Sequence, residues 1–211
     1  MNRAEKIFAR LDAINPNPQT ELLYESNFEL LIAVMLSAQS TDIQVNKVTR
    51  VLFAQAKTPA EMLNLGLDRV KSCIRSLGLF NTKASNIIKT CDLLINDYHG
   101  QVPCGRESLE SLAGVGRKTA NVVLNTAFGQ PTLAVDTHIF RVAHRLGLAH
   151  GKTPRAVEDQ LLKIIPEKFL KNAHHLLILH GRYVCTARKP HCTTCVLRDL
   201  CDYYGLELGN F

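Results

Sequence analysis

The stretch LAGVGRKTANVV, residues 112–123, places two glycines directly before an apolar helix that starts with an Arg-Lys pair. A Gly-x-Gly turn lets two short helices meet closely, because glycine accepts a left-handed backbone and leaves room for a neighbour. With Val115 packing inward, Gly114 and Gly116 therefore predict a helix–hairpin–helix over about 106–128.

The start of the second helix in this hairpin is suited to an anion. Its backbone N–H groups point outward and its dipole favours negative charge, so a DNA phosphate would fit beside Gly114, Gly116 and Arg117. A turn that only caps the helix is the alternative. A nucleotide-binding P-loop fits poorly, because Ser111 stands where that motif needs its first glycine and no strand precedes it.

Lys118 lies in the first turn of the same helix, where a cation opposes the helix dipole. This placement favours the neutral amine that a nucleophilic lysine needs. The alternative is a solvated lysine on an exposed helix face.

Asp136 precedes the helix in LAVDTHIFRVAHRL, residues 133–146. It is either an N-cap residue or a carboxylate that faces a cleft beside Lys118. Together the two residues could act on a sugar: the lysine could form an imine at a sugar carbon, and the aspartate could stabilise the cationic transition state. His138 would lie near the same place in a supporting role.

The rest of the chain repeats apolar residues at three- and four-residue spacing, which predicts helices and no alternating strands. Gly78 and Gly100 are expected to end helices, Gly78 as a left-handed C-cap. We find no internal repeat, and the predicted fold class is all-α. The remaining predicted helices cover residues 3–14, 28–39, 45–55, 59–65, 67–78, 83–99, 137–146, 154–165 and 168–183.

The composition is that of a globular protein, with 46% hydrophobic and 21% charged residues in a chain of 211. No apolar run reaches the roughly 20 residues that span a bilayer, and the N-terminus lacks the apolar core of a signal peptide. We therefore expect no membrane partner and a cytoplasmic protein, associated with the nucleoid in a cell without a nucleus. The net charge of +6 favours polyanionic partners.

Four of the seven cysteines form the pattern Cys-x6-Cys-x2-Cys-x5-Cys near the C-terminus, at Cys185, Cys192, Cys195 and Cys201. Four thiolates in so short a segment predict a site for zinc or for an iron–sulfur cluster. Spacing alone leaves these two open. Because the last 25 residues are poor in apolar side chains, the metal is expected to fold them.

The loop between the first two of these cysteines carries Arg188 and Lys189. A metal that fixes both ends of the loop would present these two cations to phosphate at low ordering cost. The alternative is a merely solvated pair of charges.

These motifs together resemble those of the endonuclease III family of DNA glycosylases. The glycine turn with its lysine, the stretch VDTHIFRV and the cysteine pattern follow the family's order and spacing, and the resemblance spans essentially the whole chain. MLSAQSTD at 35–42 and GLFNTKA at 78–84 also resemble family segments. One departure is Ala113, which stands where many members carry proline.

The resemblance implies two helical domains with the active site in the cleft between them. A six-helix barrel would occupy 20–130, and residues 1–19 and 131–211 would form an iron–sulfur domain with its cluster loop at 185–201. Lys118 and Asp136 would face each other across the cleft. The cofactor would be a structural [4Fe-4S] cluster with the four cysteines as ligands.

The implied reaction is removal of an oxidised pyrimidine from double-stranded DNA, followed by strand cleavage 3′ to the abasic site. Lys118 would form a Schiff base with the sugar, and Asp136 would stabilise positive charge there. Gln39 and Leu79 would fill the gap left by the flipped base. Without the resemblance, Gln39 is a polar residue at a helix end and Leu79 a packing residue.

Three other functions fit parts of the pattern. An adenine-mismatch glycosylase shares the cluster, but that family lacks a lysine at position 118 and carries a further C-terminal domain, whereas this chain is expected to end at Phe211. A non-catalytic iron–sulfur DNA-binding module would need only the hairpin and the basic loop. A redox sensor would use the cluster to alter DNA affinity.

The enzyme is expected to act as a monomer.

Overall fold

The computed structural model describes residues 2–205, so residues 206–211, with Phe211 and the end of the predicted iron–sulfur domain, lie outside the described part. Residues 2–205 contain eleven α-helices and two 3-10 helices, followed by a short helical stretch at 202–205, and no residue among them lies in a strand. The all-α prediction is confirmed.

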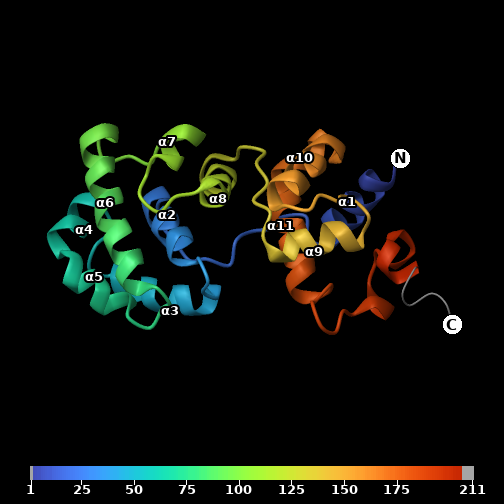
Figure 1. Ribbon diagram of the computed structural model, residues 1–211, viewed down its shortest axis with the longest axis horizontal. Coiled ribbons are helices and arrows are strands. Elements are labelled where there is room, and N and C mark those ends of the chain that lie inside the picture. Colours follow the sequence, from blue (N-terminus) through green and yellow to red (C-terminus); the bar gives the residue numbers. More distant parts are fainter. Residues whose placement is uncertain (1, 206–211) are drawn as a thin grey trace. The chain divides into compact units, whose positions relative to one another are not determined.

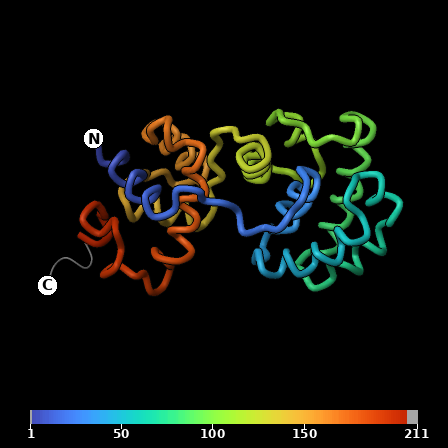
Figure 2. The backbone as a smooth tube through the Cα atoms, turned by 180° about the vertical axis from the view of Figure 1, so that it is seen from behind, coloured from blue at the N-terminus to red at the C-terminus, as the bar shows by residue number. Residues whose placement is uncertain are grey.

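The chain divides into two compact units (Figures 1 and 2). One, here called the central unit, covers Glu21–Gly129. The other, the terminal unit, combines Met1–Thr20 with Gln130–Phe211. Each unit has its own apolar core.

The central unit is built around helix α2 (Asn27–Leu36), whose sequence NFELLIAVML is apolar on nearly every face. A helix that is hydrophobic all round must be enclosed by others, and residues 28–36 are all buried. Helices α3, α6 and α8 pack against it. The other helices of this unit are α3 (Asp42–Phe53), α4 (Pro59–Leu65), α5 (Leu67–Ile74), α6 (Phe80–Tyr98), α7 (Arg106–Glu110) and α8 (Arg117–Phe128).

The terminal unit joins the start of the chain to its end. Helix α1 (Arg3–Ile14) packs against α11 (Glu167–Tyr183), and Figures 1 and 2 show α1 among the C-terminal helices. Phe8 on α1 stacks on Phe169 on α11, with ring centroids 6.1 Å apart. The remaining elements are α9 (Thr137–Arg145), α10 (Pro154–Ile164) and the 3-10 helices η1 (Cys192–Thr194) and η2 (Arg198–Leu200).

The prediction of a left-handed C-cap at Gly78 is wrong. Helix α5 ends at Ile74 with Arg75 as its C-cap, and Gly78 is not among the described glycines with positive φ. The left-handed residue is Leu79, with φ of 58°, and it caps the start of α6. The turn residues after Ile74 therefore lead into the next helix, which begins at Phe80 and earlier than predicted.

In the described part of the chain, we find no helix with the length and apolar character that crossing a membrane requires.

Candidate functional site

The hairpin between α7 and α8 requires glycine at position 114. Gly114 has φ of +77°, and a Cβ atom there would lie 2.5 Å from Asn86 Nδ2 on α6. The neighbouring carbonyl of Ala113 accepts a hydrogen bond of 3.0 Å from Thr90 Oγ1, and Val115 is buried. The turn is thus pressed against α6 and anchored to it, and Ala113 takes part in the anchor without a proline ring.

Gly116 has no such requirement within the protein. Its φ of −96° and ψ of 177° are extended backbone that other residues adopt, and a Cβ atom there would meet no described atom within 4 Å. It is the N-cap of α8 and supplies no side-chain cap. The first N–H groups of α8 are among those that a helix cannot satisfy itself. This combination leaves a bare helix start open to a ligand from outside.

Lys118 lies in the first turn of α8 and is exposed, and Arg117 beside it is half-buried. Both belong to the central unit. The structure therefore places two cations next to the bare start of α8, where the predicted phosphate contact and the predicted nucleophile lie one residue apart.

Asp136 is the N-cap of α9, as one of the two interpretations of the sequence proposed. Its Oδ1 accepts a hydrogen bond of 2.8 Å from the N–H of Ile139. This bond holds the half-buried carboxyl group at the start of the helix. Capping and a catalytic role are compatible, because a cap bond uses one oxygen of the carboxylate.

His138 lies at the contact between α9 and α11. Its Nδ1 is 3.4 Å from Arg141 Nη2, and Arg141 also donates to the carbonyls of Gly181 at 2.8 Å and Cys185 at 3.0 Å. A Cβ atom at Gly181 would come within 3.0 Å of His138 Cβ. His138 is thus close-packed and linked through Arg141 to Cys185, the first cysteine of residues 185–201, which are called the cluster segment below.

Gln39 and Leu79 share an unusual backbone conformation. Gln39 has φ of 56° and Leu79 has φ of 58°, and both are exposed. Left-handed backbone is uncommon outside glycine, asparagine and aspartate, and it is strained for a bulky residue. The predicted helix through Gln39 ends instead at Leu36, so both residues lie on turns beside helix ends.

Lys83, which is not among the functional residues predicted from the sequence, connects these two turns. Its side chain is buried, and Nζ donates to the carbonyl of Leu36 at 2.8 Å and to Ser40 Oγ at 3.0 Å. Burial lowers the pKa of Lys83. The only signal in the sequence is its spacing: Lys83 shares a helical face with the buried Ile87 and Leu94.

The four cysteines of the predicted metal site line one cavity of the terminal unit. This common cavity is the observation that supports a shared cofactor, since four thiolates are the usual ligands of an iron–sulfur cluster. Within the described residues no group of three or more His, Cys, Asp or Glu is placed to hold a single metal ion. The cysteines are Cys185, Cys192, Cys195 and Cys201.

Burial raises the pKa of the Cys195 and Cys201 thiols, because a buried thiolate loses its hydration. At Cys195 a backbone hydrogen bond partly offsets this effect on the pKa. The N–H of Leu197 donates to Cys195 Sγ at 3.4 Å, and Arg145 Nη1 lies 3.5 Å from Cys185 Sγ. Metal coordination would stabilise the thiolates further. Burial lowers the pKa of His180 to about 4, so its ring stays neutral. Its Nε2 atom lies 3.9 Å from Cys195 Sγ.

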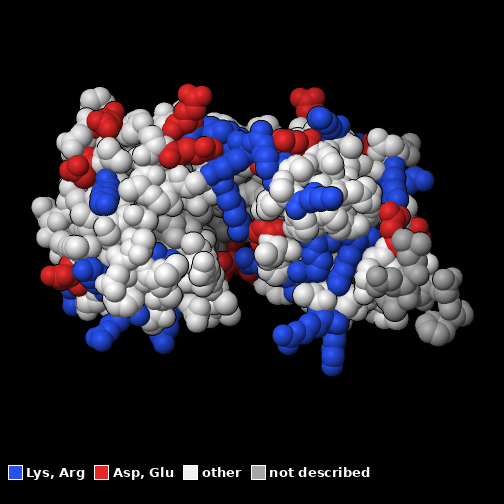
Figure 3. Space-filling view, in the orientation of Figure 1, with Lys and Arg blue, Asp and Glu red and all other residues white. Residues whose placement is uncertain are grey.

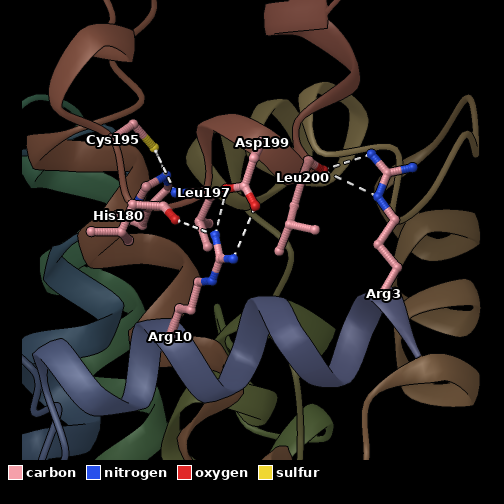
Figure 4. Close-up of polar contacts among 8 residues, drawn as sticks. Arg3, Arg10, His180, Cys195, Leu197, Asp199 and Leu200 are labelled. Carbon is pink, nitrogen blue, oxygen red and sulfur yellow. Dashed lines mark hydrogen bonds and ion pairs between the residues drawn. The ribbon is translucent and has the colours of Figure 1, made fainter. Parts of the chain in front are cut away.

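Helix α1 holds the second half of the cluster segment in place (Figure 4). Arg10 donates to the carbonyl of Val196 at 2.7 Å and to Asp199 at 2.9 Å. Arg3 reaches from the same helix to the carbonyl of Leu200, also at 2.7 Å. The first residues of the chain thus contribute to the cluster segment, and their spacing in the sequence gives no sign of it.

Arg188 and Lys189 are exposed on the loop after Cys185. Thr186 Oγ1 donates to the carbonyl of Lys189 at 2.7 Å, and Arg145 donates to the carbonyl of Thr186, also at 2.7 Å. The loop backbone is therefore fixed while the two cations face solvent. In Figure 3, several Lys and Arg side chains protrude from the unit that contains α9–α11.

Two family models match the chain. One, described as the HhH-GPD superfamily base excision DNA repair protein, matches residues 32–167. The other, described as the iron–sulfur binding domain of endonuclease III, matches residues 185–201 and decides between zinc and iron–sulfur in favour of the latter.

Curated relatives match nearly the full chain. Endonuclease III of Haemophilus influenzae is 60% identical over 205 residues, which cover 96% of this chain and 97% of that protein. Endonuclease III of Escherichia coli K12 is 58% identical with the same coverage.

Solved structures agree with these matches. A trapped endonuclease III–DNA covalent intermediate, in an estranged-adenine complex, matches with a TM-score of 0.90 and 44% identity over 96% of this chain and 97% of that one. A non-covalent endonuclease III–DNA complex matches with a TM-score of 0.90 and 45% identity, covering 96% of each chain.

Proposed function

Since the chain belongs to the endonuclease III family, base excision DNA repair enzymes that are DNA glycosylases and abasic-site lyases, we propose that it removes oxidised pyrimidines from double-stranded DNA and cleaves the strand 3′ to the abasic site. Its partner is DNA and its cofactor is a [4Fe-4S] cluster. In the proposal it acts as a monomer on duplexes that carry an oxidised pyrimidine or an abasic site.

Lys118 is the proposed nucleophile. Its neutral amine attacks C1′ of the flipped nucleotide, and the glycosidic bond breaks so that the base leaves with the bonding electrons and takes up a proton. Opening of the sugar ring gives a protonated imine at C1′. Loss of a C2′ proton then expels the 3′ phosphate by β-elimination, and water hydrolyses the imine to free the lysine.

Asp136 is the proposed electrostatic partner of this lysine. A carboxylate near the sugar stabilises positive charge as the base leaves and assists the proton transfers that follow. The N-cap bond to Ile139 supports this role because it fixes the group on the rigid start of α9.

The proposed DNA contacts come from both units. The N–H groups after Gly114 and Gly116, with Arg117, bind a backbone phosphate. Arg188 and Lys189 bind phosphates from the loop of the terminal unit. Gln39 and Leu79 fill the space that the flipped nucleotide leaves in the base stack, which offsets part of the unstacking cost. His138 is a further proposed contact.

Cys185, Cys192, Cys195 and Cys201 are the proposed ligands of the cluster, in the cavity that they line. The bound cluster supplies a rigid crosslink among short loops and no step of the reaction. Arg145 holds the loop that follows Cys185, and Arg10 holds the segment that follows Cys195.

The observation that carries the proposal is the start of α8. Gly116 leaves the helix start bare, and Lys118 stands exposed on its first turn. A phosphate bound at the helix start would bring a deoxyribose within reach of an amine that no described contact occupies.

The decisive experiment is borohydride trapping on a duplex with one thymine glycol. Reduction of the imine links the protein covalently to DNA, so the wild-type protein is expected to form an adduct and Lys118→Ala none. Lys89→Ala, which removes an exposed lysine from α6, is the matched control and should form the adduct. Lys118→Gln should still bind the lesion.

Absence of the adduct from wild-type protein with an intact cluster would overturn the lysine mechanism. If base release continued without it, a monofunctional glycosylase of the adenine-mismatch type would be the better description. If only DNA binding continued, the chain would be a non-catalytic module.

A further inference from the structure

The two turns that carry Gln39 and Leu79 are joined by one side chain. We infer that Lys83 is a positioning residue, which sets the spacing of these turns so that Gln39 and Leu79 enter the DNA stack as a pair. The inference rests on the proposed function, because it takes these two residues as the ones that fill the gap.

The first contact of Lys83 fixes the Gln39 turn. Helix α2 ends at Leu36, and the carbonyl of that residue lacks a partner within its own helix. The Lys83 ammonium donates to this carbonyl at 2.8 Å and to Ser40 Oγ at 3.0 Å. It thus holds both ends of the turn in which Gln39 is left-handed.

The second contact fixes the position of Leu79. The backbone N–H of Lys83 donates to the carbonyl of Leu79 at 3.0 Å and closes the first turn of α6. The same residue therefore binds the Leu79 turn with its backbone and the Gln39 turn with its side chain. A shift of either turn would break a contact to Lys83.

The burial of Lys83 indicates that its charge serves this geometry. It is the one buried lysine among residues 2–205, with 7% of its surface exposed. A buried ammonium is costly, and an apolar side chain of the same length would avoid that cost. The cation instead lies at the C-terminal end of α2, where the helix dipole favours it. Two acceptors and burial also keep the amine from reacting with DNA.

The test compares Lys83→Met with Lys89→Met, which removes an exposed lysine from the same helix. Two substrates are cut under single-turnover conditions: a duplex with a thymine glycol, and a preformed abasic site in an unpaired bubble. The bubble leaves no stack to fill but still needs Lys118. Lys83→Met should slow cleavage of the duplex by about tenfold or more and that of the bubble by less than about threefold. Lys89→Met should change neither rate, and Lys83→Arg should restore part of the loss.

A double-mutant cycle shows whether Lys83 acts through its turns. In a Leu79→Ala background, Lys83→Met should slow duplex cleavage by a smaller factor than it does in the wild-type protein, because the effects of coupled residues are not additive. Ser40→Ala, which removes one acceptor of Lys83, should lower the ratio of the duplex rate to the bubble rate by a smaller factor. This variant replaces Lys83→Met in the test if Lys83→Met folds poorly.

Three outcomes decide the matter. Equal slowing of both substrates would make Lys83 a residue of the fold only and overturn the inference. The inference would also be overturned if Lys83→Met cut the duplex at the wild-type rate while Leu79→Ala cut it slowly. That result would leave the proposed function intact. Wild-type protein that cuts neither substrate would overturn the proposed function and this inference with it.

Discussion

Leu79 combines an exposed apolar side chain with a left-handed backbone, and both are unfavourable for a residue that only supports the fold. Its side chain is 59% exposed and its φ is 58°. Left-handed backbone costs a residue with a Cβ atom about 1–2 kcal/mol, and such strain gathers at functional sites. The proposed insertion of Leu79 into DNA explains why the protein retains this unfavourable combination.

A pair of substitutions at this position separates the strain from the side chain. Leu79→Ala and Leu79→Gly both remove the side chain, but only glycine relieves the backbone. Leu79→Gly should therefore melt about 2–4 °C above Leu79→Ala, the shift that about 1 kcal/mol produces in a domain of this size. Both variants should cut lesion DNA slowly. Thermal unfolding of the cluster-loaded proteins measures the difference, and a higher melting temperature for alanine would contradict it.

Single residues also show what the sequence could predict. The capping interpretation of Asp136 and the inward position of Val115 are confirmed, because both depend on nearest neighbours. The contacts of Lys83 could not be predicted, since its partner Leu36 is 47 positions away. Because glycine adopts a left-handed backbone most easily, the sequence predicts this conformation at Gly78. The packing of α6 instead places it at Leu79.

At the scale of elements, the hairpin between α7 and α8 uses its two glycines for different purposes. Gly114 is required by its φ of +77° and by Asn86, whereas Gly116 has ordinary backbone and open space around it. The Gly-x-Gly pattern predicts the turn but does not distinguish these roles. The difference appears only once α6 is placed against the turn.

Substituting alanine at each position should separate folding from DNA binding. Gly114→Ala forces a Cβ atom into left-handed backbone and against Asn86, so it should lower the free energy of unfolding by about 1–3 kcal/mol. Gly116→Ala should change stability by less than about 1 kcal/mol but weaken binding to undamaged duplex. Denaturant unfolding and fluorescence anisotropy measure the two effects. Equal stability losses, or unchanged affinity in Gly116→Ala, would argue against the assignment.

Helix ends were the least predictable feature of the elements. Thr41 and Thr153 cap their helices with side-chain bonds to the N–H groups of Gln44 and Ala156, as such residues usually do. By contrast, α2 ends at Leu36, three residues before the predicted end of the helix at Gln39. The contact from Lys83 on another helix stabilises that early end.

At the scale of the whole molecule, the chain folds its first helix onto its last segment. Arg3 and Arg10 on α1 contact Leu200 and Asp199, which lie almost 200 positions away. The cysteine spacing predicts a metal-bound segment, but spacing alone does not distinguish zinc from an iron–sulfur cluster. It also could not show that α1 holds this segment.

The net charge of +6 raises the question whether DNA binding uses the whole surface or particular cations. Arg188 and Lys189 are exposed on a loop whose backbone is held by Arg145. Each phosphate contact contributes about −0.9 to the slope of log affinity against log salt. Arg188→Ala with Lys189→Ala should therefore make the slope less negative by up to about 2.

The matched control is Lys152→Ala with Lys163→Ala, two exposed lysines of the same unit. Both double variants lower the net charge from +6 to +4, since each removes two cations. Because counterion release counts only the charges that lie against phosphates, the control should keep the wild-type slope. Fluorescence anisotropy on undamaged duplex from low to physiological salt gives the slopes. If both variants reduced the slope equally, net charge alone would govern binding and the loop would have no special contact with DNA.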